Sequence, residues 1–212
     1  MLALKRPTAH RQRGETLVGL LVGLALGLLV LAGGAHMLAR LLQGHRLALQ
    51  DSHVQQDLHF ALDLMASELQ DAQYTAGAWN SRSPGACTDA FCDGPEDFSL
   101  GSGRIDWSLD RNHNGAQDND ECTGYRLRSG ALQVRTACTP EVWTALTDTT
   151  SLRLTQLQTS LQCQVQSGWL RRQVHLQLQA QWSQDATRTL ALQRTVALRN
   201  DLPQSVQTRY CP

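Results

Sequence analysis

The stretch that decides the fold is TLVGLLVGLALGLLVLAGGA, residues 16–35, which contains no charged side chain. Twenty residues in a helix rise about 30 Å, the thickness of the hydrocarbon core of a membrane. Four basic residues lie before Gly14 with no acidic residue among them: Lys5, Arg6, Arg11 and Arg13. Because basic residues stay on the cytoplasmic side, we expect a single-pass anchor whose C-terminal part faces outward.

An ordinary secretory signal is the alternative interpretation of this segment. Such a signal has a shorter apolar region followed by a cleavage site of small residues, and it is removed. The apolar stretch is long for a signal, but small residues near Ala35 leave this alternative open.

Beyond the anchor, the sequence predicts that the helix continues. No proline occurs between Pro7 and Pro84. One apolar stripe recurs at helical spacing, formed by Val54, Leu58, Leu62, Met65 and Leu69. We therefore expect one helix to about Tyr74, roughly 60 residues or 90 Å long, whose second half packs against a domain.

The N-terminus resembles the leader of type IV prepilins. Residues 13–22 read RGETLVGLLV, and in that family a basic stretch and a glycine precede a Phe-Thr-Leu-Val-Glu-Leu-like start. The resemblance implies that prepilin peptidase cuts on the cytoplasmic side, between Gly14 and Glu15. It also implies that Glu15, Thr16 and Gly19 take part in assembly with other major and minor pilins through the N-terminal helix.

Two positions differ from the family pattern. Glu15 stands where the family usually has Phe, and Gly19 stands where nearly all members have Glu. In the family that glutamate is thought to pair with the amino terminus of a neighbouring subunit, and such a pair is strong in hydrocarbon. Pseudopilins at the filament tip characteristically lack it, so we expect a tip subunit; alternatively, Glu15 takes over the role or other contacts drive assembly.

A second stretch makes the resemblance more specific. Residues 60–74, FALDLMASELQDAQY, are similar to a segment of PilW-like minor pilins and J-type minor pseudopilins of type II secretion. The resemblance implies an α+β pilin fold: leader 1–14, filament-core helix 15–40, amphipathic helix 41–75 and β-rich head 76–212. It implies a bacterial inner-membrane precursor that becomes a pilus subunit at the cell surface and primes or caps assembly.

The remainder of the chain predicts strands. Residues 125–134 read as a hairpin around Ser129 and Gly130, and alternating apolar residues in 161–165, 174–182 and 190–198 predict further strands. We therefore expect an antiparallel sheet packed on the long helix.

Six cysteines all follow the apolar segment, which predicts disulfides in an oxidising compartment. Cys122 and Cys138 are equidistant from Gly130, so a three-residue loop there would place them opposite each other. Cys87 with Cys92 would close a small loop, leaving Cys163 with Cys211. Six cysteines allow 15 connectivities, so the other pairings stay open.

Residues 110–121, DRNHNGAQDNDE, fit the calcium-loop pattern D-x-[DN]-x-[DN]-G-x5-E. Calcium prefers six to eight oxygen ligands. The candidate ligands are Asp110, Asn112, Asn114, the carbonyl of Ala116, Asp118 and Glu121. Strand-like flanks exclude a paired EF-hand sensor, so we expect a single structural calcium loop; an Asx-rich turn that binds nothing is the alternative.

Charge and motifs narrow the function further. Four of the 19 basic residues precede Gly14, so 15 basic and 19 acidic residues follow it. This excess of acid argues against general nucleic-acid binding, although a local basic patch stays open. No G-x-S-x-G, H-E-x-x-H or phosphate-binding glycine loop occurs, so we expect no enzyme. The alternative of a different class is a membrane-tethered, calcium-dependent binding protein without a filament.

Overall fold

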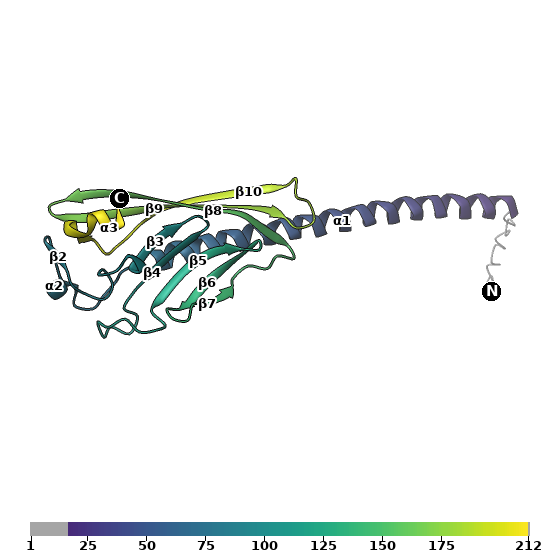
Figure 1. Ribbon diagram of the computed structural model, residues 1–212. Coiled ribbons are helices and arrows are strands. Elements are labelled where there is room, and N and C mark those ends of the chain that lie inside the picture. Colours follow the sequence, from purple (N-terminus) through teal and green to yellow (C-terminus); the bar gives the residue numbers. More distant parts are fainter. Residues whose placement is uncertain (1–16, 212) are drawn as a thin grey trace, which may run out of the picture. The chain divides into compact units, whose positions relative to one another are not determined.

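The computed structural model describes residues 17–211, and for residues 46, 47 and 50 it describes the backbone alone. The chain divides into two compact units, Met1–Leu49 and Gln50–Pro212. The long helix α1, Leu17–Leu69, contributes residues to both units (Figure 1).

In its described part, the first unit is the N-terminal portion of α1. From Leu17 to His45 this helix is long and apolar enough to cross a membrane, by length and composition. Its leucines and valines are exposed; Leu17 is 76 % and Val30 75 % exposed. A helix with exposed apolar side chains on all faces requires lipid or other helices around it.

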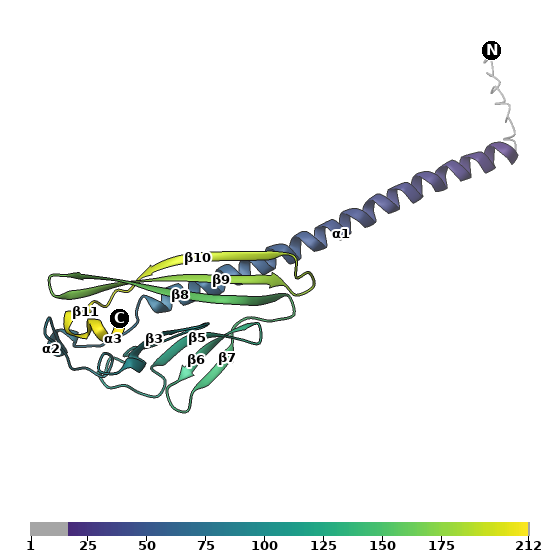
Figure 2. The same ribbon diagram turned by 45° about the horizontal axis from the view of Figure 1, so that its top comes forward.

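The second unit has two main sheets that lie along the C-terminal part of α1 (Figures 1 and 2). The five-stranded sheet, in spatial order, consists of β3 (Phe98–Gly101), β4 (Arg104–Ser108), β5 (Cys122–Arg128), β6 (Ala131–Ala137) and β7 (Val142–Ala145). The four-stranded sheet consists of β8 (Leu152–Gln166), β9 (Trp169–Trp182), β10 (Thr189–Ala197) and β11 (Leu202–Pro203). In this sheet β9 pairs with each of the other three strands.

Short elements complete this unit. A small hairpin and four single-turn helices connect or end the longer strands. They are α2 (Ala78–Ser81), β1 (Arg82–Ser83), β2 (Ala86–Cys87), η1 (Pro95–Asp97), η2 (Gln204–Val206) and α3 (Gln207–Tyr210). Every strand pairing among the described residues is antiparallel.

The helix and both sheets share one apolar core. The predicted stripe is confirmed, since its five side chains are at most 4 % exposed. Trp107 and Tyr125 from one sheet and Leu176 and Leu178 from the other pack in the same cluster. Burying each of these large side chains contributes about 1.5–3 kcal/mol, so this packing supplies the main stabilisation of the unit.

Turn chemistry sets the register of the β5–β6 and β8–β9 hairpins. Ser129 and Gly130 have φ of 55° and 84°, and Ser167 and Gly168 have φ of 52° and 83°. Two successive positive φ angles are typical of the two-residue turns whose twist matches that of the flanking strands. The α+β pilin-like fold expected from the sequence is therefore present, with an antiparallel head on a long helix.

The structure differs from the prediction in two respects. α1 ends at Leu69 rather than about Tyr74, because Gln73 has a φ of 57° and its N–H bonds to the carbonyl of Ser108 instead of continuing the helix. The head also has two main sheets where a single sheet was expected.

Candidate functional site

The predicted N-terminal site lies mostly outside the described residues. Gly14, Glu15 and Thr16 fall in residues 1–16, so the predicted cleavage site and two of the three assembly residues have no structural description. Gly19 is the third residue of α1. It lies in the apolar stretch that is long enough to span a membrane.

The six cysteines of the head form three disulfides. They join Cys87 to Cys92, Cys122 to Cys138 and Cys163 to Cys211, which are the pairs expected from spacing. The Cα–Cα distances of 6.1, 4.9 and 6.2 Å lie in the ordinary range for disulfides.

The reasoning behind the Cys122–Cys138 pair was wrong in one respect. The hairpin turn has two residues rather than three, because Arg128 pairs directly with Ala131. That register places residue 137, not Cys138, opposite Cys122. The pairing of β6 with β7 is irregular between Arg135 and Ala137, and just beyond it the N–H of Cys138 bonds to the carbonyl of Asn119 at 2.7 Å, near its disulfide partner.

The predicted calcium loop connects β4 to β5, and its two ends are held rigidly. The N–H of Leu109 bonds to the carbonyl of Glu121 at 3.0 Å, and the N–H of Asp110 bonds to the carbonyl of Tyr74 at 2.8 Å. Asp110 and Glu121 are fully buried, whereas residues 111–120 are exposed. The first and last candidate ligands therefore lie on the inner side of an exposed loop.

These two carboxylates orient the backbone of the loop. Asp110 accepts hydrogen bonds from the N–H groups of Ala76, Asn114 and Gly115 at 2.8–3.0 Å. Glu121 accepts hydrogen bonds from the backbone N–H groups of Arg111, Asn112 and Asp118 at 2.7–3.2 Å. Among the described residues, no Lys, Arg or His forms an ion pair with any carboxylate of the loop. The loop therefore holds four acidic residues that are not paired with a protein cation.

The remaining candidate ligands meet on the exposed side. The amide nitrogens of Asn112 and Asn114 donate to the same oxygen of Asp118, at 2.7 and 2.9 Å. Gly115 adopts a φ of 76°, which permits the sharp turn at the sixth loop position. Asn114 also accepts a hydrogen bond from the N–H of Ala116 at 2.7 Å, so the loop brings the predicted positions together.

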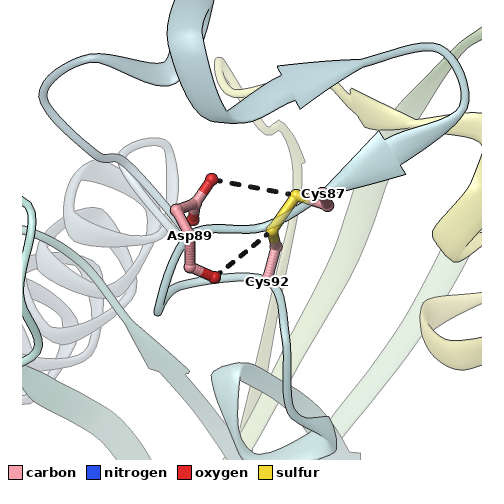
Figure 3. Close-up of side chains that lie close together, drawn as sticks. All are labelled: Cys87, Asp89 and Cys92. Carbon is pink, nitrogen blue, oxygen red and sulfur yellow. Dashed lines mark hydrogen bonds between the residues drawn. A yellow bond between two sulfur atoms is a disulfide. The ribbon is translucent and has the colours of Figure 1, made fainter.

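A second cluster of ligand-type residues lies in the loop after α2 (Figure 3). Cys87, Asp89 and Cys92 have candidate ligand atoms within 4.8 Å of one another. The two sulfurs are joined in the disulfide, and Asp89 binds Arg82 through both oxygens at 2.8 and 3.0 Å. All three groups are thus engaged in bracing the loop, and we assign no metal to them.

Electrostatics support the bracing role of Asp89. Burial would raise the pKa of Asp89, but the hydrogen bonds and charge of Arg82, with hydrogen bonds from Ser81 and Phe91, lower the pKa below its ordinary value. Arg82 also donates to the carbonyl of Gln73 at 2.8 Å. The pair is nearly inaccessible to water and ties this loop to the end of α1.

Sequence reasoning missed several buried polar residues. Arg172 is 2 % exposed and Asp97 is 1 % exposed. The sequence pattern could have predicted the burial of Arg172, because it alternates with exposed residues of β9 and lies between the inward-facing Leu170 and Val174. Asp97 lies in the single-turn helix η1 and had no signal, because burial there depends on contacts with Ser108 and Gln117 that are distant in sequence.

Comparison with known proteins places the chain in a family. A family model described as prepilin peptidase-dependent protein B matches residues 47–198, about seven tenths of the chain. The chain belongs to this family. No curated protein and no solved structure matches this chain. The match begins after the apolar stretch Leu17–His45, so the membership of the prepilin peptidase-dependent protein B family is independent of the leader motif.

The family and the fold together define the class of protein. A member of the prepilin peptidase-dependent protein B family with an apolar N-terminal helix and a disulfide-braced α+β head is a pilin-like structural protein. The helix is compatible with a single-pass membrane anchor.

Proposed function

We propose that the chain is a minor pilin subunit that primes or caps the assembly of a type IV pilus. The observation that carries this proposal is the family match over residues 47–198 in a chain that also has a separate prepilin-like leader. The leader reads RGETLVGLLV at residues 13–22. Two non-overlapping parts of the chain thus point to the same class of protein.

Assembly is the mechanism that these parts support. Prepilin peptidase removes residues 1–14 at the cytoplasmic face of the inner membrane, and the new chain begins at Glu15. The exposed apolar side chains of Leu17–His45 keep the precursor in the membrane. In the filament, the apolar helices of other major and minor pilins replace lipid around the same surface, and the head faces outward.

Gly19 supports a position at the tip. The ion pair attributed to the family requires a carboxylate at this position to receive the amino terminus of an adjacent subunit, and glycine has no carboxylate. The first subunit of a filament has no earlier subunit whose amino terminus it could bind, so it does not need this carboxylate. The runner-up is a minor pseudopilin of a type II secretion system, which uses the same chemistry in a different machine.

The first test is the intact mass and N-terminal sequence of the protein purified from its native membrane. A chain that begins at Glu15, with a methylated amine, supports prepilin processing. An intact Met1, or a start near His36, contradicts the filament proposal and favours a tethered or secreted binding protein instead.

We also propose that the 110–121 loop binds one calcium ion that stabilises the head. The support is the match at the ligand positions and the burial of Asp110 and Glu121 without a protein cation as a partner in the described residues. Carboxylates forced together repel one another, and a divalent cation removes this repulsion. Asp110, Asn112, Asn114, Asp118 and Glu121 would supply side-chain oxygens, and Ala116 its carbonyl.

Thermal unfolding tests the calcium proposal. We expect millimolar calcium to raise the Tm of the wild-type head by several degrees, because ligand that binds the native state stabilises it. Glu121→Gln should abolish the increase, whereas Asp120→Asn, which removes a neighbouring exposed charge, should retain it. An equal response of the two variants, or none in the wild type, would show that the loop is a turn without an ion.

A further inference from the structure

Two strands of the head have one edge that pairs with no other strand, and these edges line the same groove. β3 pairs only with β4, and β8 pairs only with β9. Across the described residues, no backbone hydrogen bond joins β3 to β8. Unpaired strand edges carry free N–H and C=O groups that can pair with another chain.

The register shows which backbone groups of β8 point outward. The two-residue turn makes Gln166 and Trp169 a hydrogen-bonded pair, and the pairing then alternates along the strand. Leu157, Thr159 and Leu161 are consequently residues whose N–H and C=O groups point away from β9. A register shift between Leu154 and Gln156 places Leu154 on the same edge, and its N–H bonds to the carbonyl of Gly130 at 2.9 Å.

The same argument applies to β3. Its two-residue turn at Ser102 and Gly103 makes Gly101 and Arg104 a hydrogen-bonded pair, so the N–H and C=O of Leu100 point away from β4. Within the described residues, these groups of Leu100 form no backbone hydrogen bond with a segment other than β4.

The open edges lie along two adjoining grooves. One, of about 450 Å³, lies between the turn of β3 and the Thr155–Thr159 part of β8. The other, of about 640 Å³, lies between β3, Leu161 and Cys163 of β8, and the C-terminal segment with Arg209. Leu100 lines both, so the two adjoin at this residue, and together we call them the β3–β8 groove.

The groove is apolar on its inner side and carries an unsatisfied polar atom. Leu100 and Leu161 are half-buried and Leu157 is buried. The hydroxyl of Thr159 is buried and has no hydrogen-bond partner. Among the residues lining the groove in the described chain, none is acidic and one, Arg209, is basic.

We propose that the β3–β8 groove binds an extended segment of a partner protein, which adds a strand to the open edge of β8. Only a peptide backbone supplies donors and acceptors at the spacing of the open groups along Leu157, Thr159 and Leu161. Alternate side chains of the segment point inward to Leu100 and Leu161 and outward to water. The charge of Arg209 selects a segment with an acidic residue or a terminal carboxylate at that end.

This inference does not depend on the filament proposal, because the open edges exist whether or not the chain is cut and assembled. The test uses the full-length protein in detergent micelles and a library of synthetic ten-residue peptides, randomised at every position. We expect the selected peptides to alternate apolar and polar residues and to protect the amides of Leu157, Thr159 and Leu161 from hydrogen exchange.

Two comparisons separate strand addition from binding through side chains alone. N-methylation of alternate peptide amides on the pairing edge removes donors while the side chains remain, and should weaken binding to the wild-type protein at least about tenfold. Thr159→Pro removes a donor from the open edge of β8 and should weaken binding similarly. Gln193→Pro, on the open edge of β10, is the matched control and should leave binding unchanged.

Three results would overturn the inference. They are a library that yields no peptide protecting the β8 amides, binding that N-methylation does not change, and equal effects of Thr159→Pro and Gln193→Pro. The N-methylation comparison uses the wild-type protein, so it decides the question even where a proline variant does not fold.

Discussion

Arg172 is a buried cation whose contacts are with neutral groups rather than with a carboxylate. No acidic partner lies within ion-pair distance among the described residues. The guanidinium donates to the side-chain oxygen of Gln73 and, at 3.1 Å, to the carbonyl of Asn200, and it lies over the rings of Phe98 and Tyr210. Burial lowers the pKa of Arg172 to about 9. These neutral contacts join β9 to the end of α1 and to the C-terminal segment.

Asp97 provides a prediction at the scale of one residue. Burial raises the pKa of Asp97 to about 6, although hydrogen bonds from the N–H of Gly94 and the hydroxyl of Ser108 oppose the shift. The native state therefore binds the proton more tightly than the unfolded state. This contribution to stability is fully present below pH 3.8, the ordinary pKa, and is lost as the pH rises through about 6.

Asp97→Asn, which mimics the protonated acid, should increase the free energy of unfolding at pH 7. A shift of two pKa units corresponds to at most about 3 kcal/mol. At pH 4 the difference between the variant and the wild type should largely disappear. Urea unfolding of both proteins at the two pH values measures this, and a difference that does not change with pH would contradict the pKa assignment.

At the scale of elements, the disulfides close loops of very different lengths. The bonded cysteines are 5, 16 and 48 residues apart in the pairs Cys87–Cys92, Cys122–Cys138 and Cys163–Cys211. The entropy that a cross-link removes from the unfolded chain grows with the logarithm of loop length, giving about 2, 3 and 4 kcal/mol for the three pairs. Replacing each pair by alanine should destabilise the head in that order.

Urea unfolding of the three double-alanine variants tests the order, and each variant serves as the control for the others. A larger loss from the Cys87–Cys92 pair than from the Cys163–Cys211 pair would show that local bracing dominates. Arg82 and Asp89 would then be the residues responsible, because they pack beside the shortest loop.

Elements differ in how well the sequence predicted them. The stripe from Val54 to Leu69 was found because helical periodicity records which face is buried. The turn at Ser129 and Gly130 was found because few residues other than glycine favour positive φ. The end of α1 was missed, since the turn at Gln73 depends on hydrogen bonds to Phe91 and Ser108, which are distant in sequence.

At the scale of the whole molecule, the division into two units predicts that the head folds alone. Among the described residues, every buried apolar side chain belongs to residue 54 or a later one. A chain of residues 50–212 therefore keeps the entire core and all three disulfides, and it loses the apolar segment. We expect it to be soluble without detergent when expressed in an oxidising compartment.

The measurement is the Tm of residues 50–212 in buffer, compared with that of the full-length protein in detergent. Equal values within a few degrees are expected, because every buried apolar side chain among the described residues lies in the second unit. Insolubility, or the loss of cooperative unfolding, would show that the head requires the first part of α1.

The tip position can be tested by restoring the carboxylate that the family pattern contains. Gly19→Glu would allow the subunit to receive the amino terminus of another pilin, so immunogold label should spread from the filament ends along the shaft. Gly23→Glu places the same residue one helical turn further on, where no partner charge is expected, and its label should stay at the ends. Both glycines lie in α1. Label along the shaft for the wild-type protein would exclude a tip subunit, because a chain that is already incorporated internally has no need of the missing carboxylate.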